Sequence, residues 1–370
     1  YCNYKEQGYS RRRSSSNIQY RLSTLFRKQK VYIMTVQDLY DVISDISTQD
    51  VKLYFVTRKT KENITKKMRA KDKYLFRVYQ IDCDDELRET ILSASKEQLK
   101  ATIDKNFDLV DYDILSDETE NLFTYSIKNK VFSFSDVVTN QLLSTNIEKV
   151  KNLFDITSNG DSLWAYCVEF FNLSTKQKIY TFRKLLPSKV CVDEKSTKWL
   201  RAMFSTKSQK LTILKEETVN LDYQIDCIFC DEIFYVLKKA YFEQILGLHE
   251  EYKEKATEIA NKMVDSGNFI GSEKLLELIE TKPSIHKKLL KVEKIGSYTN
   301  LTTNDMKRMC RVCKKYNDKL PMKDGKLVVE SEADIDVVLK ALADYYKIGE
   351  ISKKSYGTFS GKELKGTTSK

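Results

Sequence analysis

Apolar and polar positions alternate along the first half of the chain in a way that predicts a helix followed by strands. After Met34, the capping box Thr35–Asp38 opens a helix whose apolar positions recur at helical spacing: Val36, Leu39, Tyr40 and Ile43. Strand-like runs follow at 51–57 and 74–81, a polar helix at 85–103, and shorter strands at 109–115 and 122–127. Residues 147–154 have helical spacing and are expected to link to the second half.

The second half shows the same change of pattern, from strands to helices. Residues 163–171 and 179–185 alternate as a strand pair, and extended segments are expected at 211–219 and 225–237. Helical periodicity starts at Lys239, and further helices are expected at 272–280, 284–294, 303–317 and 332–346, the last behind the capping box Ser331–Asp334. Strands that are followed by helices favour an α+β fold over a doubly wound parallel sheet.

A length of 370 residues fits about two domains. We interpret residues 1–33, which contain Arg11-Arg12-Arg13, as a disordered upstream or artificial extension; a targeting peptide or a basic arm is the alternative. Residues 34–155 are expected to form an N-terminal α+β domain. Residues 156–370 are expected to form a second domain, with strands at 160–238 and helices at 239–346.

The positive charge is concentrated in two segments. Residues 1–33 contribute +7 of the net charge of +10, so the rest of the chain carries only +3. Residues 281–330 hold 13 Lys/Arg against 5 Asp/Glu, a local charge of +8. A local basic surface is therefore a better argument about partners than the charge of the whole protein.

The motifs that could support catalysis or metal binding are weak. Cys227/Cys230 and Cys310/Cys313 form two CxxC pairs, but the first lies in a predicted strand, where the two side chains point to opposite faces, and the second in a helix without a knuckle turn. Buried thiols are the default interpretation. His249 and His286 lack a nucleophilic partner, so no catalytic residue, metal site or cofactor is predicted. Asp161 with Asp193-Glu194-Lys195 keeps a metal-dependent nuclease open, whereas Gly357-x3-Gly361-Lys362 departs from a phosphate loop.

Two consecutive predicted helices carry the strongest physical signal. Each places basic residues opposite an apolar stripe, so together they could present one cationic face that binds a phosphate backbone with low sequence preference. The predicted DNA contacts are Lys287, Lys288, Lys291, Lys294, Lys307, Arg308, Arg311, Lys314 and Lys315. A solvated lysine face, acidic lipids or an acidic protein surface would satisfy the same charges.

The second half also resembles a known family. The segments DSLWAYCVEFFNLSTKQKIYTFRKL (161–185) and IDCIFCDEIFYVLKKAYFEQIL (225–246), with the Lys239–Glu243 stretch, the basic helix at 303–317 and residues 356–362, are similar to the KwaB-like family. The resemblance covers about residues 161–365. It includes Phe242 and Glu243, which we interpret as structural residues at a strand-to-helix junction.

This resemblance implies a cytoplasmic anti-phage defence protein of the Kiwa system. It implies a non-enzymatic subunit that engages DNA and acts with a small multi-helix membrane protein (KwaA-like), at the inner face of the cell membrane where that partner recruits it. Such a subunit would interfere with phage DNA replication or transcription, and we expect a homo-oligomer such as a dimer. The rival hypotheses are a metal-dependent nuclease of a defence system and a basic module that docks on a membrane protein or on acidic lipids.

Overall fold

The computed structural model describes residues 33–62, 68–116, 121–152, 155–157, 161–186, 190–191, 202–205, 207, 209–213, 218–296 and 298–359. Every helix and strand below lies in one compact unit, residues 36–370. The expectation that residues 1–33 form a disordered extension falls outside these ranges, except for Ile33. Among the described helices, none is both long and apolar enough to cross a membrane.

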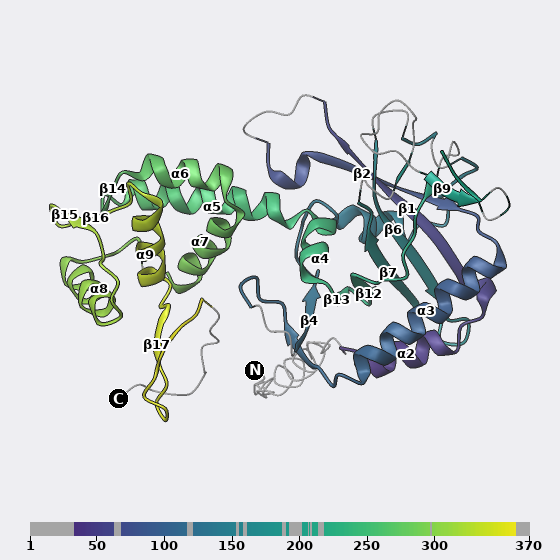
Figure 1. Cartoon of the computed structure of the whole chain (residues 1–370), viewed down its shortest axis with the longest axis horizontal. Coiled ribbons are helices and arrows are strands. Elements are labelled where there is room, and N and C mark those ends of the chain that lie inside the picture. The colour runs from purple at the N-terminus through teal and green to yellow at the C-terminus, as the bar shows by residue number, and fades with distance from the viewer. Residues whose placement is uncertain are drawn as a thin grey trace, which may run out of the picture. The chain divides into compact units, whose positions relative to one another are not determined.

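The predicted α+β architecture is confirmed, and a mixed sheet is its centre (Figure 1). Within the described residues the sheet has nine strands in the order β3-β4-β13-β12-β7-β6-β1-β2-β5. Only the outermost pairs, β3 with β4 and β2 with β5, are parallel. The strands are β1 (Val51–Thr60), β2 (Tyr74–Ile81), β3 (Asp108–Asp111), β4 (Asn121–Ser126), β5 (Glu148–Val150), β6 (Ser162–Phe171), β7 (Lys178–Lys184), β12 (Cys227–Cys230) and β13 (Ile233–Val236).

Strands from both sides of the expected boundary near residue 155 pair in this sheet. β1 lies between β2 and β6, with Val51 opposite Phe170, and β4 pairs with β13. The two segments thus share one sheet and one core, while the division into domains stays a prediction.

Helices cover both faces of the sheet. On one face α2 (Val36–Ser44) packs against α3 (Asp85–Ile103), and α3 contacts β1. On the other, α4 (Lys239–Leu246), the π-helical turn Val137–Gln141 and the start of α5 (Leu248–Asp265) bury apolar side chains from strands throughout the sheet. Phe134, Phe182, Phe234 and Phe242 are all fully buried in this core.

The C-terminal helices form a second core. It contains the later turns of α5 together with α6 (Ser272–Thr281), α7 (Pro283–Ile295), α8 (Thr303–Lys315) and α9 (Glu332–Leu342). A small sheet of β14 (Phe269–Ile270), β16 (Lys326–Val328) and β15 (Met322–Lys323) lies beside them, and a hairpin of β17 (Tyr346–Ile348) and β18 (Ser355–Gly357) follows α9. Shorter strands complete the described structure: β8 (Val190–Cys191), β9 (Ala202–Ser205), β10 (Lys210–Ile213) and β11 (Thr218–Val219).

Several local predictions were wrong. Residues 148–150 form a strand instead of a helix, because they pair with the edge of β2. The expected extended segment at 225–237 is present, but it forms a hairpin of two strands, because Asp231 and Glu232 both adopt left-handed backbone angles, with φ of 49° and 63°. The long helix after Lys239 divides at Gly247, whose φ is 73° and whose added Cβ would lie 3.3 Å from Cβ of Ser133. The last helix ends at Leu342, so Tyr346 belongs to a strand.

Candidate nucleic-acid interface

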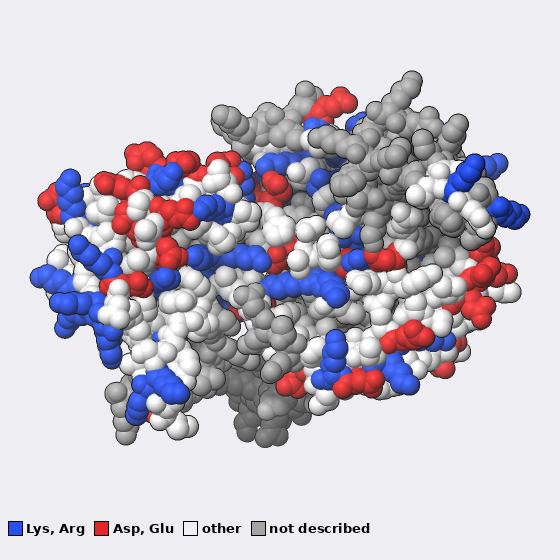
Figure 2. Space-filling view, in the orientation of Figure 1, with Lys and Arg blue, Asp and Glu red and all other residues white. Residues whose placement is uncertain are grey.

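The five predicted contacts on α8 lie on one exposed helical surface. Thr302 and Asp305 form a capping box that starts this helix, and Met306 and Cys313 are buried against the C-terminal core. The opposite side carries the exposed residues Lys307, Arg308, Arg311, Lys314 and Lys315. Asp305 is the one acidic residue of α8, and its carboxylate already accepts the hydroxyl and backbone N–H of Thr302. In Figure 2, basic side chains gather over α8 and continue over the β17–β18 hairpin.

Two turns next to α8 extend this basic surface with residues that the sequence prediction missed. The rings of Tyr316 and Tyr346 stack with centroids 4.9 Å apart, and the Tyr346 hydroxyl donates to Asp318 at 2.6 Å, which fixes the β17–β18 hairpin to the end of α8. Cys310 Sγ lies 3.0 Å from Met322 Sδ in the β15 strand. Both turns carry exposed lysines: Lys319, Lys323, Lys326, Lys347, Lys353 and Lys354.

The four predicted contacts on α7 lie in a different environment. Lys287 Nζ is 2.9 Å from both carboxylate oxygens of Glu243, which is almost fully buried, and Lys288 Nζ is 2.6 Å from Asp336 Oδ1. These two charges are therefore paired within the protein. Lys291 is buried and Lys294 is exposed, and both line a cavity next to the sheet. In the described residues, α7 and α8 do not form one uninterrupted row of free cations.

The histidines and cysteines occupy structural positions. His286 is buried and its Nε2 contacts the carbonyl of Ile279 at 2.6 Å, whereas His249 lies 3.7 Å from Glu243. Burial raises the pKa of Cys227 well above its usual value, as expected for a buried thiol. Among the described residues, no cluster of three metal-ligating side chains occurs. Asp161 accepts from Thr57 at 3.3 Å, while Asp193-Glu194-Lys195 and Gly361-Lys362 lie outside the described residues.

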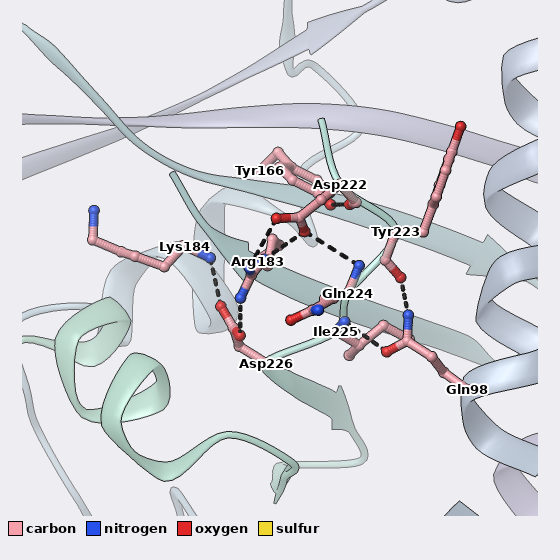
Figure 3. Close-up of polar contacts among 9 residues, drawn as sticks. All are labelled: Gln98, Tyr166, Arg183, Lys184, Asp222, Tyr223, Gln224, Ile225 and Asp226. Carbon is pink, nitrogen blue, oxygen red and sulfur yellow. Dashed lines mark hydrogen bonds and ion pairs between the residues drawn. The ribbon is translucent and has the colours of Figure 1, made fainter. Parts of the chain in front are cut away.

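A buried ionic network connects β7, α3 and the segment before β12 (Figure 3). Arg183 binds both carboxylate oxygens of Asp222, at 2.7 and 2.8 Å, and its Nη1 lies 2.5 Å from Oδ1 of the fully buried Asp226. Asp226 Oδ2 also accepts the backbone N–H of Lys184 at 2.7 Å. From α3, the Gln98 amide donates to the carbonyl of Tyr223 and accepts the N–H of Ile225. These contacts hold the segment 222–226 against β7 and α3.

Lys184, next to Arg183, is a buried cation of this region. Its Nζ donates to the carbonyls of Trp164 and Leu185 at 2.9 and 2.8 Å and lies 3.7 Å from the centre of the Trp164 ring. Burial, followed by the nearby charge of Arg58, lowers the pKa of Lys184 to about 8. No carboxylate contacts the ammonium directly in the described residues, so its charge is held by carbonyls and an aromatic ring.

The fold and these surfaces define an α+β protein with a cationic C-terminal helical region. The family model described as Kiwa protein KwaB-like matches residues 160–352, which include β6, β7 and all of α4 to α9. The chain belongs to the KwaB-like family, which confirms the resemblance found in the sequence and assigns the protein to Kiwa anti-phage defence. No curated protein and no solved structure matches the chain significantly.

Proposed function

We propose that this protein is a non-enzymatic DNA-binding subunit of Kiwa anti-phage defence, which contacts the phosphate backbone mainly through α8. The observation that supports this proposal is the exposed row Lys307, Arg311, Lys314 and Lys315, with Arg308 beside it. Asp305 is the one acidic residue of α8, and its carboxylate already accepts hydrogen bonds from Thr302. Cations that replace condensed counterions on DNA bind in a salt-dependent way with little sequence preference.

The remaining predicted contacts are expected to contribute less. The charges of Lys287 and Lys288 are already neutralised by Glu243 and Asp336, so phosphate would have to compete with existing ion pairs. Lys291 and Lys294 remain proposed contacts at the edge of the interface.

The family context adds partners to this proposal. We propose that the protein acts in the cytoplasm as a homo-oligomer such as a dimer, and that a small multi-helix membrane protein (KwaA-like) recruits it to the inner face of the cell membrane. Bound there to phage DNA, it would block replication or transcription. An exposed cationic helix without a membrane-spanning segment among the described residues is compatible with such peripheral recruitment.

The test is a titration of protein that starts at Met34 into labelled duplex DNA at two salt concentrations. Removing residues 1–33 excludes their arginines as the cause of binding. We expect salt-sensitive binding that Lys307→Glu combined with Arg311→Glu weakens by roughly tenfold or more, while the slope of log affinity against log salt falls by about 2, since two phosphate contacts are lost.

The matched control combines Lys100→Glu with Lys149→Glu, which reverses the charge of two exposed lysines in the sheet region and changes the net charge by the same amount. Equal weakening by the control pair would assign binding to overall charge and contradict the α8 interface. Magnesium and a denaturing gel belong in the same experiment, because cut DNA would favour the nuclease hypothesis. Binding to vesicles of acidic lipid without DNA affinity would favour a membrane-docking module instead.

A further inference from the structure

Four lysines from three separate elements line one cavity at the junction of the two cores. Lys130 follows β4, Lys255 lies on α5, and Lys291 and Lys294 lie on α7. The cavity has a volume of about 490 Å³, within the range of small-molecule sites. In Figure 2, basic side chains also gather between the regions of α7 and β4.

The positive charge of this lysine cavity exceeds its negative charge. Asp113 and Glu251 are the carboxylates among its lining residues, against the four lysines, and Glu251 Oε1 is already engaged at 3.3 Å by the backbone N–H of Ser133. None of the ion pairs within 4.0 Å in the described chain includes Lys130, Lys255 or Lys294.

The lysines also disfavour one another's charge. Burial lowers the pKa of Lys130; the charge of Asp111 partly offsets this, and the nearby Lys255 lowers the pKa again. Burial likewise lowers the pKa of Lys291; the charge of Asp113 opposes the shift, and Lys294 adds to it. A bound anion would relieve both repulsions, whereas water alone leaves them in place.

Aromatic and apolar side chains also line the cavity, and they indicate which class of anion it would bind. Tyr125, Phe132 and Tyr252 line the cavity together with Leu248 and Leu290, and Lys130 Nζ lies 3.6 Å from the centre of the Tyr125 ring. Inorganic phosphate needs no such surface. A ligand with an anionic end, a planar apolar part and hydroxyl or amino donors matches the lysines, the aromatic rings and Asp113.

We propose that the lysine cavity binds a nucleotide, with its phosphates on the lysines and its base against the aromatic wall. The nucleotide could be a free small molecule or the terminal unit of a DNA strand, since both present the same groups. This inference does not depend on α8, because none of the residues that line the cavity belongs to that helix.

The test measures binding of ATP, adenosine and inorganic phosphate to the full chain by titration calorimetry and thermal shift. We expect ATP to bind and raise the melting temperature, and adenosine and phosphate to bind far more weakly. Lys130→Glu combined with Lys255→Glu should lower ATP affinity at least about tenfold, because each charge reversal replaces attraction by repulsion. The α8 variant Lys307→Glu with Arg311→Glu should keep full ATP binding.

Failure to bind ATP, or ATP binding that survives the Lys130/Lys255 reversal, would overturn the proposal. Phosphate that binds as tightly as ATP would also overturn it, because the base would then contribute nothing. Displacement of ATP by a 5′-phosphorylated oligonucleotide identifies a strand end as the natural ligand, and lack of displacement identifies a free nucleotide. Because α8 and cavity variants are measured side by side, loss of DNA binding and loss of nucleotide binding remain distinguishable.

Discussion

At the scale of single residues, the protonation of Lys184 is coupled to folding. Lys184 is 7% exposed, and its folded-state pKa of about 8 lies below the ordinary 10.5 of lysine. Between these pH values the unfolded chain binds the proton and the folded protein does not. The contribution of Lys184 to the free energy of unfolding therefore rises with pH across this window, and below pH 8 the cost of burying its charge is fully present.

We expect this effect to appear as a difference between the wild type and Lys184→Met. Urea unfolding at pH 8 and pH 9.5 should show the wild type gaining about 1 to 2 kcal/mol relative to the variant, as the buried ammonium loses its proton. Comparing the two proteins cancels the titration of the buried tyrosines, which Lys184→Met leaves in place. The exposed Lys100→Met serves as a control with a flat difference. A Lys184→Met difference that stays constant with pH would contradict the lowered pKa.

At the scale of elements, the contact between α4 and α7 explains why Lys287, a predicted DNA contact on α7, has a structural role that the predicted contacts on α8 lack. Glu243 lies on α4 with 2% of its side chain exposed, and it accepts the Tyr112 hydroxyl at 2.5 Å as well as both contacts from Lys287. From the sequence we interpreted Glu243 only as a structural residue at a strand-to-helix junction. Its partner, 44 residues away on α7, could not be identified from helical spacing.

Removing Lys287 should therefore cost stability instead of DNA affinity. Lys287→Met leaves the Glu243 carboxylate buried without its cation, so we expect a loss of about 2 to 4 kcal/mol in chemical denaturation. Lys288→Met is the matched control, since Lys288 and Asp336 are both more than 20% exposed and such a pair is worth about 1 kcal/mol or less. Adding Glu243→Gln to Lys287→Met should recover part of the loss, and equal small losses for both lysines would contradict this role.

The elements that the sequence predicted correctly are those with a long local pattern. The helices α3, α7 and α8 and the strand pair β6–β7 repeat their apolar positions over several turns or pleats, so local periodicity was sufficient. The basic surface of α8 was visible for the same reason, because its cations and its buried Met306 belong to one helix. Short elements such as β5 were missed, since the neighbouring strand determines them.

The lysine cavity could not be predicted from the sequence. Lys130 and Lys255 are 125 positions apart, and only the packing of α5 and α7 against the sheet brings them together. Nothing in the residues around either lysine differs from an ordinary solvated position. The sequence could have shown only that Lys130 follows a strand rich in aromatic residues, which indicates a ring that an ammonium can cover.

At the scale of the whole molecule, the sheet determines whether the KwaB-like region can fold alone. The region 160–352 contributes β6, β7, β12 and β13, but β1 covers the edge of β6 and β4 covers the edge of β13. Separating the chain near residue 155 would expose both edges together with apolar faces that β1 and β4 share with them. The change in sequence character there is therefore not expected to mark a boundary of independent folding.

We expect residues 156–370, expressed alone, to aggregate or to lack a cooperative thermal transition. Co-expression with residues 34–155 should restore soluble protein, because the two fragments can then complete the β1–β6 and β4–β13 ladders. Removing only residues 1–33 is the control, since every strand pair described here lies outside that segment. A soluble 156–370 fragment that melts cooperatively would establish it as an independent domain. In that case β1 and β4 would add area to the sheet without being required for it, and the DNA-binding and nucleotide-binding variants could be tested on the fragment alone.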